Sequence, residues 1–112
     1  MIRMFFSSKE FDVVWERMGL TDEDRRKLEN SIAANPKIGN VIRGTGGLRK
    51  MRFAPEGQGK SGGARVLYVD FVILDSVYLV TAFPKSQKED LTQEERSRFK
   101  NYLDNVRKEL NL

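Results

Sequence analysis

The chain has 112 residues and a mass of 12.9 kDa, of which 39% are hydrophobic and 32% charged, so we expect one folded domain over residues 1–112 and not a disordered tail. It contains no Cys and no His, which excludes disulfide frameworks, thiol or histidine catalysis and the common zinc sites; we expect no metal and no cofactor. With a net charge of +4, no apolar run near the roughly 20 residues of a membrane span and no signal-peptide pattern, a cytoplasmic protein without membrane contact is expected.

The first third of the chain predicts a short strand followed by two helices. Residues 2–6 are mostly apolar and favour a strand. From Lys9 to Met18 apolar residues recur at spacings of 3, 1 and 3, which predicts an amphipathic helix that ends at Gly19. A second helix is expected between a capping Thr21 and Pro36, because three acidic residues follow Thr21 and favour the positive end of a helix dipole.

The middle of the chain changes to short runs rich in Val, Leu, Tyr and Phe, separated by glycine. Three of these runs have strand length: Leu48–Phe53, Ala64–Phe71 and Val77–Phe83. Asp75-Ser76 is a plausible turn between the last two. Three neighbouring strands predict an antiparallel meander.

A last helix is predicted over Gln93–Glu109, where Thr92 and Glu95 have the spacing of a capping box. The fold class is therefore α+β, with the order β-α-α-β-β-β-α, two helices on one face of the sheet and the last helix at its edge. Seven of the 16 acidic residues fall at predicted helix starts, where we interpret them as caps and dipole partners and not as catalytic groups: Asp22, Glu23, Asp24, Glu89, Asp90, Glu94 and Glu95.

Positive charge is concentrated in one segment. Between Arg43 and Arg65 there are six basic residues and one acidic residue, interleaved with glycine and apolar residues. Such a block of one sign favours an anionic partner, most often nucleic acid, over a merely basic surface. The glycine-rich loop at 54–63 is either a simple hairpin connection or a cradle for an anion, and composition alone leaves both open.

Because side chains along a strand alternate between the two faces of a sheet, the sequence predicts on which face each of these cations lies. If Met51 and Phe53 lie in the core, Lys50 and Arg52 are displayed together on the open face and Arg49 lies at the margin. We expect further cations to join this pair from the hairpin end, the glycine loop and the end of the last strand: Arg65, Lys60 and Lys85.

Two glycine motifs share part of the pattern of nucleotide-binding loops. Gly59-Lys60-Ser61 lacks the earlier glycine of a phosphate-binding loop and leads into a strand, so nucleotide hydrolysis is rejected. Residues 44–47 (GTGG) lack the third glycine of a dinucleotide fingerprint. They are expected to form a tight turn that leads into Leu48.

Four ordered segments resemble the HigB-type toxins of the RelE superfamily: NPKIGNVI at 35–42, GTGGLRKMRF at 44–53, GKSGGARVLY at 59–68 and FPKSQKEDL at 83–91. The resemblance covers nearly the whole chain and includes the order of elements. It implies a toxin of a type II toxin-antitoxin system, a metal-independent and ribosome-dependent mRNA endonuclease. It also implies a helix-turn-helix antitoxin as partner. Through this antitoxin the toxin would contact operator DNA indirectly.

The resemblance also implies roles for individual residues. Lys50 and Arg52 are expected to contact the scissile phosphate, Arg65 to stabilise the transition state and Lys85 to complete the catalytic group. RNA-binding roles are implied for a second set: Arg49, Lys60 and Phe83. Position 83 is Phe where relatives often carry Tyr, so Phe83 either stacks on a base or joins the core, and the proton donor stays unassigned.

Tyr102 is the aromatic hydroxyl available in the last helix, where some relatives place a catalytic tyrosine. Two alternatives to the nuclease interpretation stay open. One is a superfamily toxin that acts on DNA gyrase, and the other is a non-catalytic RNA-binding domain.

Overall fold

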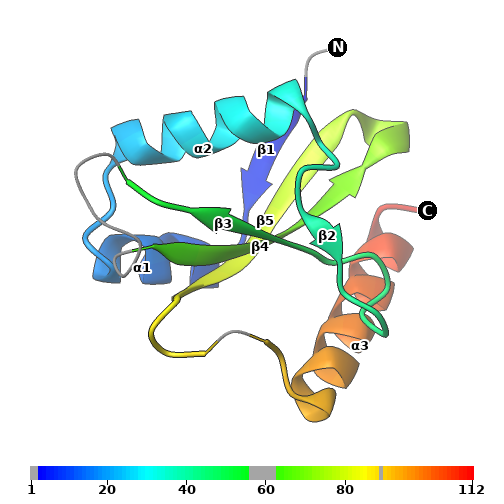
Figure 1. The fold of residues 1–112 in the computed structure, drawn as a ribbon. Helices are drawn as coiled ribbons and strands as arrows, with labels where there is room; N and C mark the ends of the chain where they lie inside the picture. The colour runs from blue at the N-terminus through cyan, green and yellow to red at the C-terminus, as the bar shows by residue number, and fades with distance from the viewer. Residues whose placement is uncertain (1–2, 56–62, 89) are drawn as a thin grey trace.

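The structure, a computed structural model, describes residues 3–55, 63–88 and 90–112. Within these residues the chain forms three α-helices and a five-stranded sheet, with a short 3-10 helix in one hairpin (Figure 1). In chain order the elements are β1 (Met4–Ser7), α1 (Lys9–Arg17), α2 (Asp22–Ala34), β2 (Asn40–Val41), β3 (Arg49–Phe53), β4 (Ala64–Phe71), η2 (Val72–Leu74), β5 (Ser76–Pro84) and α3 (Gln93–Glu109). None of the helices in these ranges is both long and apolar enough to cross a bilayer.

Helix boundaries follow the capping residues that the sequence predicted. Thr21 caps α2 and Thr92 caps α3, and each forms a reciprocal capping box with the acidic residue three positions later. At α1 the Ser8 hydroxyl accepts the N–H of Phe11, and the helix closes before Gly19, which takes a φ of +77°. The three predicted helices are confirmed, and only α1 is one residue shorter than expected.

The sheet has the order β1-β5-β4-β3-β2. Its three long strands, β3, β4 and β5, form the predicted antiparallel meander, and β1 joins the far side of β5 in parallel. The sequence did not predict β2, in which Asn40 and Val41 pair with Lys50 and Arg49 of β3. Two residues carry too little periodicity to indicate a strand.

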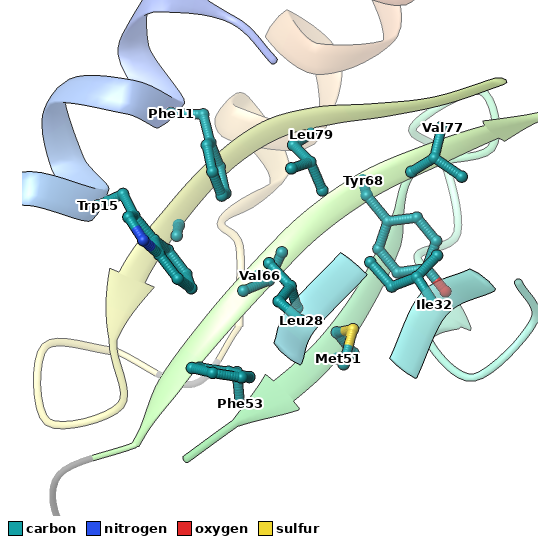
Figure 2. Close-up of a cluster of buried hydrophobic side chains, with 11 residues drawn as sticks. Phe11, Trp15, Leu28, Ile32, Met51, Phe53, Val66, Tyr68, Val77 and Leu79 are labelled. Carbon is teal, nitrogen blue, oxygen red and sulfur yellow. The ribbon is translucent and has the colours of Figure 1, made fainter. Parts of the chain in front are cut away.

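One core cluster lies between the sheet and the two N-terminal helices. Figure 2 shows Phe11 and Trp15 of α1 and Leu28 of α2 packed against one face of the strands. Met51 and Phe53 of β3 belong to this cluster, as the alternation argument required. The prediction that α1 and α2 cover one face is therefore confirmed.

A second core cluster lies on the other face, and it changes the position expected for the last helix. Leu103 of α3 is fully buried there with Leu67 and Val69 of β4 and Val80 of β5. Figure 1 shows α3 across the strands from α2. The expectation that α3 lies at the sheet edge was wrong, because its apolar stripe needs a facing surface to bury and the second face of the sheet provides it.

The turn between β2 and β3 is tight, as predicted. Gly44, Gly46 and Gly47 all take positive φ, between 77° and 108°, which favours glycine. Between them Thr45 is fully buried, and its hydroxyl donates to the Ile42 carbonyl and accepts the Leu48 N–H. This turn fixes where β3 begins and therefore which of its side chains face each cluster.

Candidate active site

Two arginines and a lysine lie on one face of neighbouring strands. Arg52 of β3 is the direct register partner of Arg65 of β4, and Arg65 is in turn the partner of Phe83 of β5. Lys50 is two residues from Arg52 and so shares its face. This face is opposite the one that carries Met51 and Phe53, as the sequence predicted.

These three cations line one pocket of about 510 Å³, together with Asn40 of β2 and the apolar residues Ile38 and Met51. Arg65 is buried and only 4% exposed, whereas Arg52 is exposed. Like charges opposite each other weaken a sheet, and a bound anion would offset this cost.

Asp90 brings a negative charge to this pocket. Lys50 Nζ donates to Asp90 Oδ1 in an ion pair across 40 positions of sequence. The hydrogen bond from Lys50 holds the pKa of the Asp90 carboxyl below its usual range, and the charges of Arg96 and Arg65 lower it further. Our interpretation of Asp90 as a helix-start residue was therefore incomplete.

A buried tyrosine anchors the segment that leads into the pocket. The Tyr68 hydroxyl is fully buried, donates to the Pro36 carbonyl at 2.8 Å and accepts the Gly39 N–H at 2.9 Å. Burial raises the pKa of Tyr68, although the hydrogen bond from Gly39 opposes the shift. Since Gly39 immediately precedes Asn40, this pair of bonds sets the position of β2 beside Lys50.

Arg49 belongs to this anchor and not to the cationic pocket. Its Nη1 donates to the Gly39 carbonyl at 2.7 Å, and its side chain alternates to the face opposite Lys50 and Arg52. The geometry gives no support to the RNA contact expected of Arg49. Its place at the margin was predicted, but the hydrogen bond that fixes it there was not.

The remaining candidate residues occupy different surroundings. Lys85 continues past β5, where its N–H donates to the Gly63 carbonyl at 3.0 Å, and it does not line the pocket. Phe83 is 6% exposed in the second core cluster, with Lys88 Nζ 5.2 Å from its ring centre. Lys60 lies outside the described residues.

A family model described as the RelE toxin of the RelE / RelB toxin-antitoxin system matches residues 4–110. The chain belongs to the RelE toxin family. Among solved structures it is similar to a double mutant of the E. coli toxin RelE in the free state, with 17% identity, 79% of this chain and 88% of that chain covered, and a TM-score of 0.57. It is also similar to a chain of the intact E. coli RelBE toxin-antitoxin complex, with 17% identity, 79% and 99% coverage and a TM-score of 0.54.

The tyrosine in the last helix of this RelE-family chain lies away from the pocket. Tyr102 is 38% exposed, and its hydroxyl is 2.5 Å from the hydroxyl of Tyr78 on β5. Burial, then the hydrogen bond with Tyr102, raises the pKa of Tyr78. Tyr102 does not line the cationic pocket, so the structure does not make it the missing proton donor.

The pocket suits a phosphodiester chemically. Guanidinium groups donate several N–H bonds in a fixed plane, and an ammonium adds a compact charge, so Arg52, Arg65 and Lys50 together complement a phosphate with several oxygens. Within the described part of the RelE-family chain, no three potential metal ligands come together. The residues that converge are therefore cations with one carboxylate beside them.

Proposed function

We propose that the protein is a ribosome-dependent mRNA endonuclease that inhibits translation as the toxin of a toxin-antitoxin system. The observation that carries this proposal is the convergence of Lys50, Arg52 and Arg65 on one pocket in a member of the RelE family. The HigB-like motifs of the sequence add support.

The proposed reaction needs no metal. The RNA 2′-hydroxyl attacks the adjacent phosphorus, the bond to the 5′-oxygen breaks, and the products are a cyclic phosphate and a free 5′-hydroxyl. Negative charge builds on the phosphorane, where Arg52 and Arg65 stabilise it and Lys50 binds a non-bridging oxygen. Loss of one well-placed donor from such a transition state costs about 3 kcal/mol, or roughly 10²-fold in rate.

The proposal assigns positioning of the message to the ribosome. The pocket has a volume of about 510 Å³ and six lining residues, so we propose that it binds a single phosphate group and leaves the positioning of the message to the ribosome. We propose a cytoplasmic location for this reason, and a single toxin domain over residues 1–112. The RelBE complex among the similar structures supports a cognate antitoxin as partner. We further propose that the protein contacts operator DNA indirectly, through that antitoxin.

The test is primer extension on ribosome-bound message after induction. The double variant Lys50→Ala plus Arg52→Ala is compared with wild type and with Arg26→Ala plus Lys108→Ala, which removes the same charge from exposed positions on α2 and α3. We expect cleavage in wild type and in the control, and none in the pocket variant. Equal cleavage in all three would remove the site assignment.

The same experiment separates the alternatives. A toxin that acts on gyrase would induce a DNA damage response and leave the message intact. A domain that only binds RNA would arrest growth equally as wild type and as the Arg65→Ala variant, because binding does not require the group that stabilises the transition state.

A further inference from the structure

We propose that Asp90 is a positioning residue, which holds the ammonium group of Lys50 at the mouth of the cationic pocket. The inference rests on the proposed nuclease function and assigns to that site a residue that lies outside the strands. It starts from the ion pair between Lys50 Nζ and Asp90 Oδ1.

Asp90 is placed by the residues that follow it. Leu91 is 7% exposed and packs in the second core cluster, and Thr92 caps α3 through the N–H of Glu95. The backbone at 91 and 92 is thus tied both to the core and to the start of a 17-residue helix. Asp90 comes directly before this support, so its backbone is held close to Lys50, although its side chain is 68% exposed.

Lys50 is a pocket cation with a long, flexible side chain, which such support would help to place. Arg65 is almost fully buried, and packing restricts its guanidinium. The Lys50 side chain is 26% exposed, and its four rotatable bonds leave the ammonium free to sample solvent unless a partner holds it. An ammonium has three N–H donors, so a bond to Asp90 does not use its whole capacity to donate.

The electrostatic surroundings of Asp90 argue against a direct chemical role. The charges of Lys50, Arg96 and Arg65 all favour its ionised form. A carboxylate that is so readily ionised is a weak proton acceptor at neutral pH, and it has no proton to give. Orientation of Lys50 is the function that remains for it.

The kinetic test is single-turnover cleavage of message on programmed ribosomes. We compare wild type, Asp90→Asn, Asp90→Glu and the control Glu94→Gln, which removes a charge from an exposed position in the first turn of α3. For Asp90→Asn we expect the cleavage rate constant to fall roughly tenfold, as for a misplaced catalytic group, with the half-saturating toxin concentration unchanged. Asp90→Glu should recover part of the rate, and Glu94→Gln should match wild type.

A second measurement follows Lys50 without any cleavage. The NMR order parameter of the Lys50 ammonium should be higher than that of Lys100, whose side chain is 55% exposed in a pair within one helix, and should fall in Asp90→Asn. Unchanged order in Asp90→Asn would overturn the proposal, and so would a faster rate, which would show that Asp90 competes with the phosphate. If wild type cleaves and Asp90→Asn matches it, the positioning role alone fails; if wild type does not cleave, the proposed function fails with it.

Discussion

Arg52 and Arg65 are register partners on adjacent antiparallel strands, so two guanidinium groups project from directly opposite positions of one sheet face. Like charges in this arrangement destabilise a sheet by a fraction of a kcal/mol to about 1 kcal/mol. We therefore predict that Arg52→Thr raises the free energy of unfolding by up to about 1 kcal/mol while cleavage is lost. Urea denaturation measures the first effect, and repeating it in 1 M salt should reduce the gain. A loss of stability in Arg52→Thr would show that the pair is not repulsive.

Tyr68→Phe tests the anchor beneath the site. The substitution removes the hydroxyl that bonds Pro36 and Gly39, and so leaves a carbonyl and an N–H without their partner in the interior. We expect a loss of about 1–3 kcal/mol in the free energy of unfolding. Tyr78→Phe is the matched control, because its hydroxyl bond to Tyr102 is exposed. Equal losses in the two variants would contradict the anchor.

Gly39→Ala tests how closely the chain passes over the same tyrosine. A Cβ at this position would lie 2.8 Å from Cε1 of the Tyr68 ring and 3.0 Å from the Lys50 carbonyl oxygen. The backbone of Lys50 cannot yield without moving β3, so we predict that β2 separates from β3 and that the pocket loses Asn40. Amide hydrogen exchange should then be faster at Asn40 and Val41 than in wild type. Gly19→Ala is the control, because this position follows α1, its φ of +77° makes the substitution strained in its own right and a Cβ there meets nothing within 4 Å; exchange at 40–41 should be unchanged in it.

Substitutions of Phe83 distinguish a role in the core from a role in base stacking. With the ring 6% exposed under Lys88, we predict that Phe83→Leu keeps wild-type cleavage, because leucine also fills the second core cluster. Phe83→Ala should cost about 3 kcal/mol in the free energy of unfolding, the usual cost of emptying such a site. Denaturation and primer extension on both variants provide the measurements. Loss of cleavage in a stable Phe83→Leu would restore the stacking role.

The pH dependence of the Lys50–Asp90 pair has a definite sign. Because the folded pKa of Asp90 is lowered, the pair's contribution to stability is fully present above the unfolded Asp pKa of about 3.9 and is lost as the pH falls through the folded value. Between pH 5 and 8 the contribution of the pair to the free energy of unfolding is therefore expected to be constant. Titration of the Asp90 carboxyl carbon by NMR should give a pKa below the usual Asp value in wild type. It should rise in Lys50→Met, and an unchanged value there would contradict the assignment.

Local signals predicted most of the fold. Thr21 and Thr92 identified two helix starts because a capping box is a short-range chemical pattern. The strands at 49–53, 64–71 and 76–84 were predicted to within a residue because apolar β-formers fill them. The face on which α3 packs was not predictable in the same way, since periodicity shows which side of a helix is buried and not which surface receives it.

The site was predictable only where strand alternation governs it. Lys50 and Arg52 were placed together from their spacing, and Arg65 was expected to join them from the hairpin end. The register of β3 with β4 puts Arg65 directly opposite Arg52. Asp90 was missed because 40 positions separate it from Lys50 and because acidic residues before a helix already have a local explanation. The RNA contact expected of Arg49 stays a prediction, whereas its hydrogen bond to the Gly39 carbonyl was not predictable, since charge alone does not distinguish a structural cation from a ligand-binding one.

The parallel pairing of β1 with β5 has a consequence for synthesis of the protein. Residues 4–7 can join the sheet only after residues 76–79 exist, and Asp90 and α3 follow later still. At translation speeds of roughly 5–20 residues per second, the nascent chain spends several seconds without a complete sheet. The N-terminal strand, although it is made first, therefore waits longest for its partner, and the sheet closes only late in synthesis.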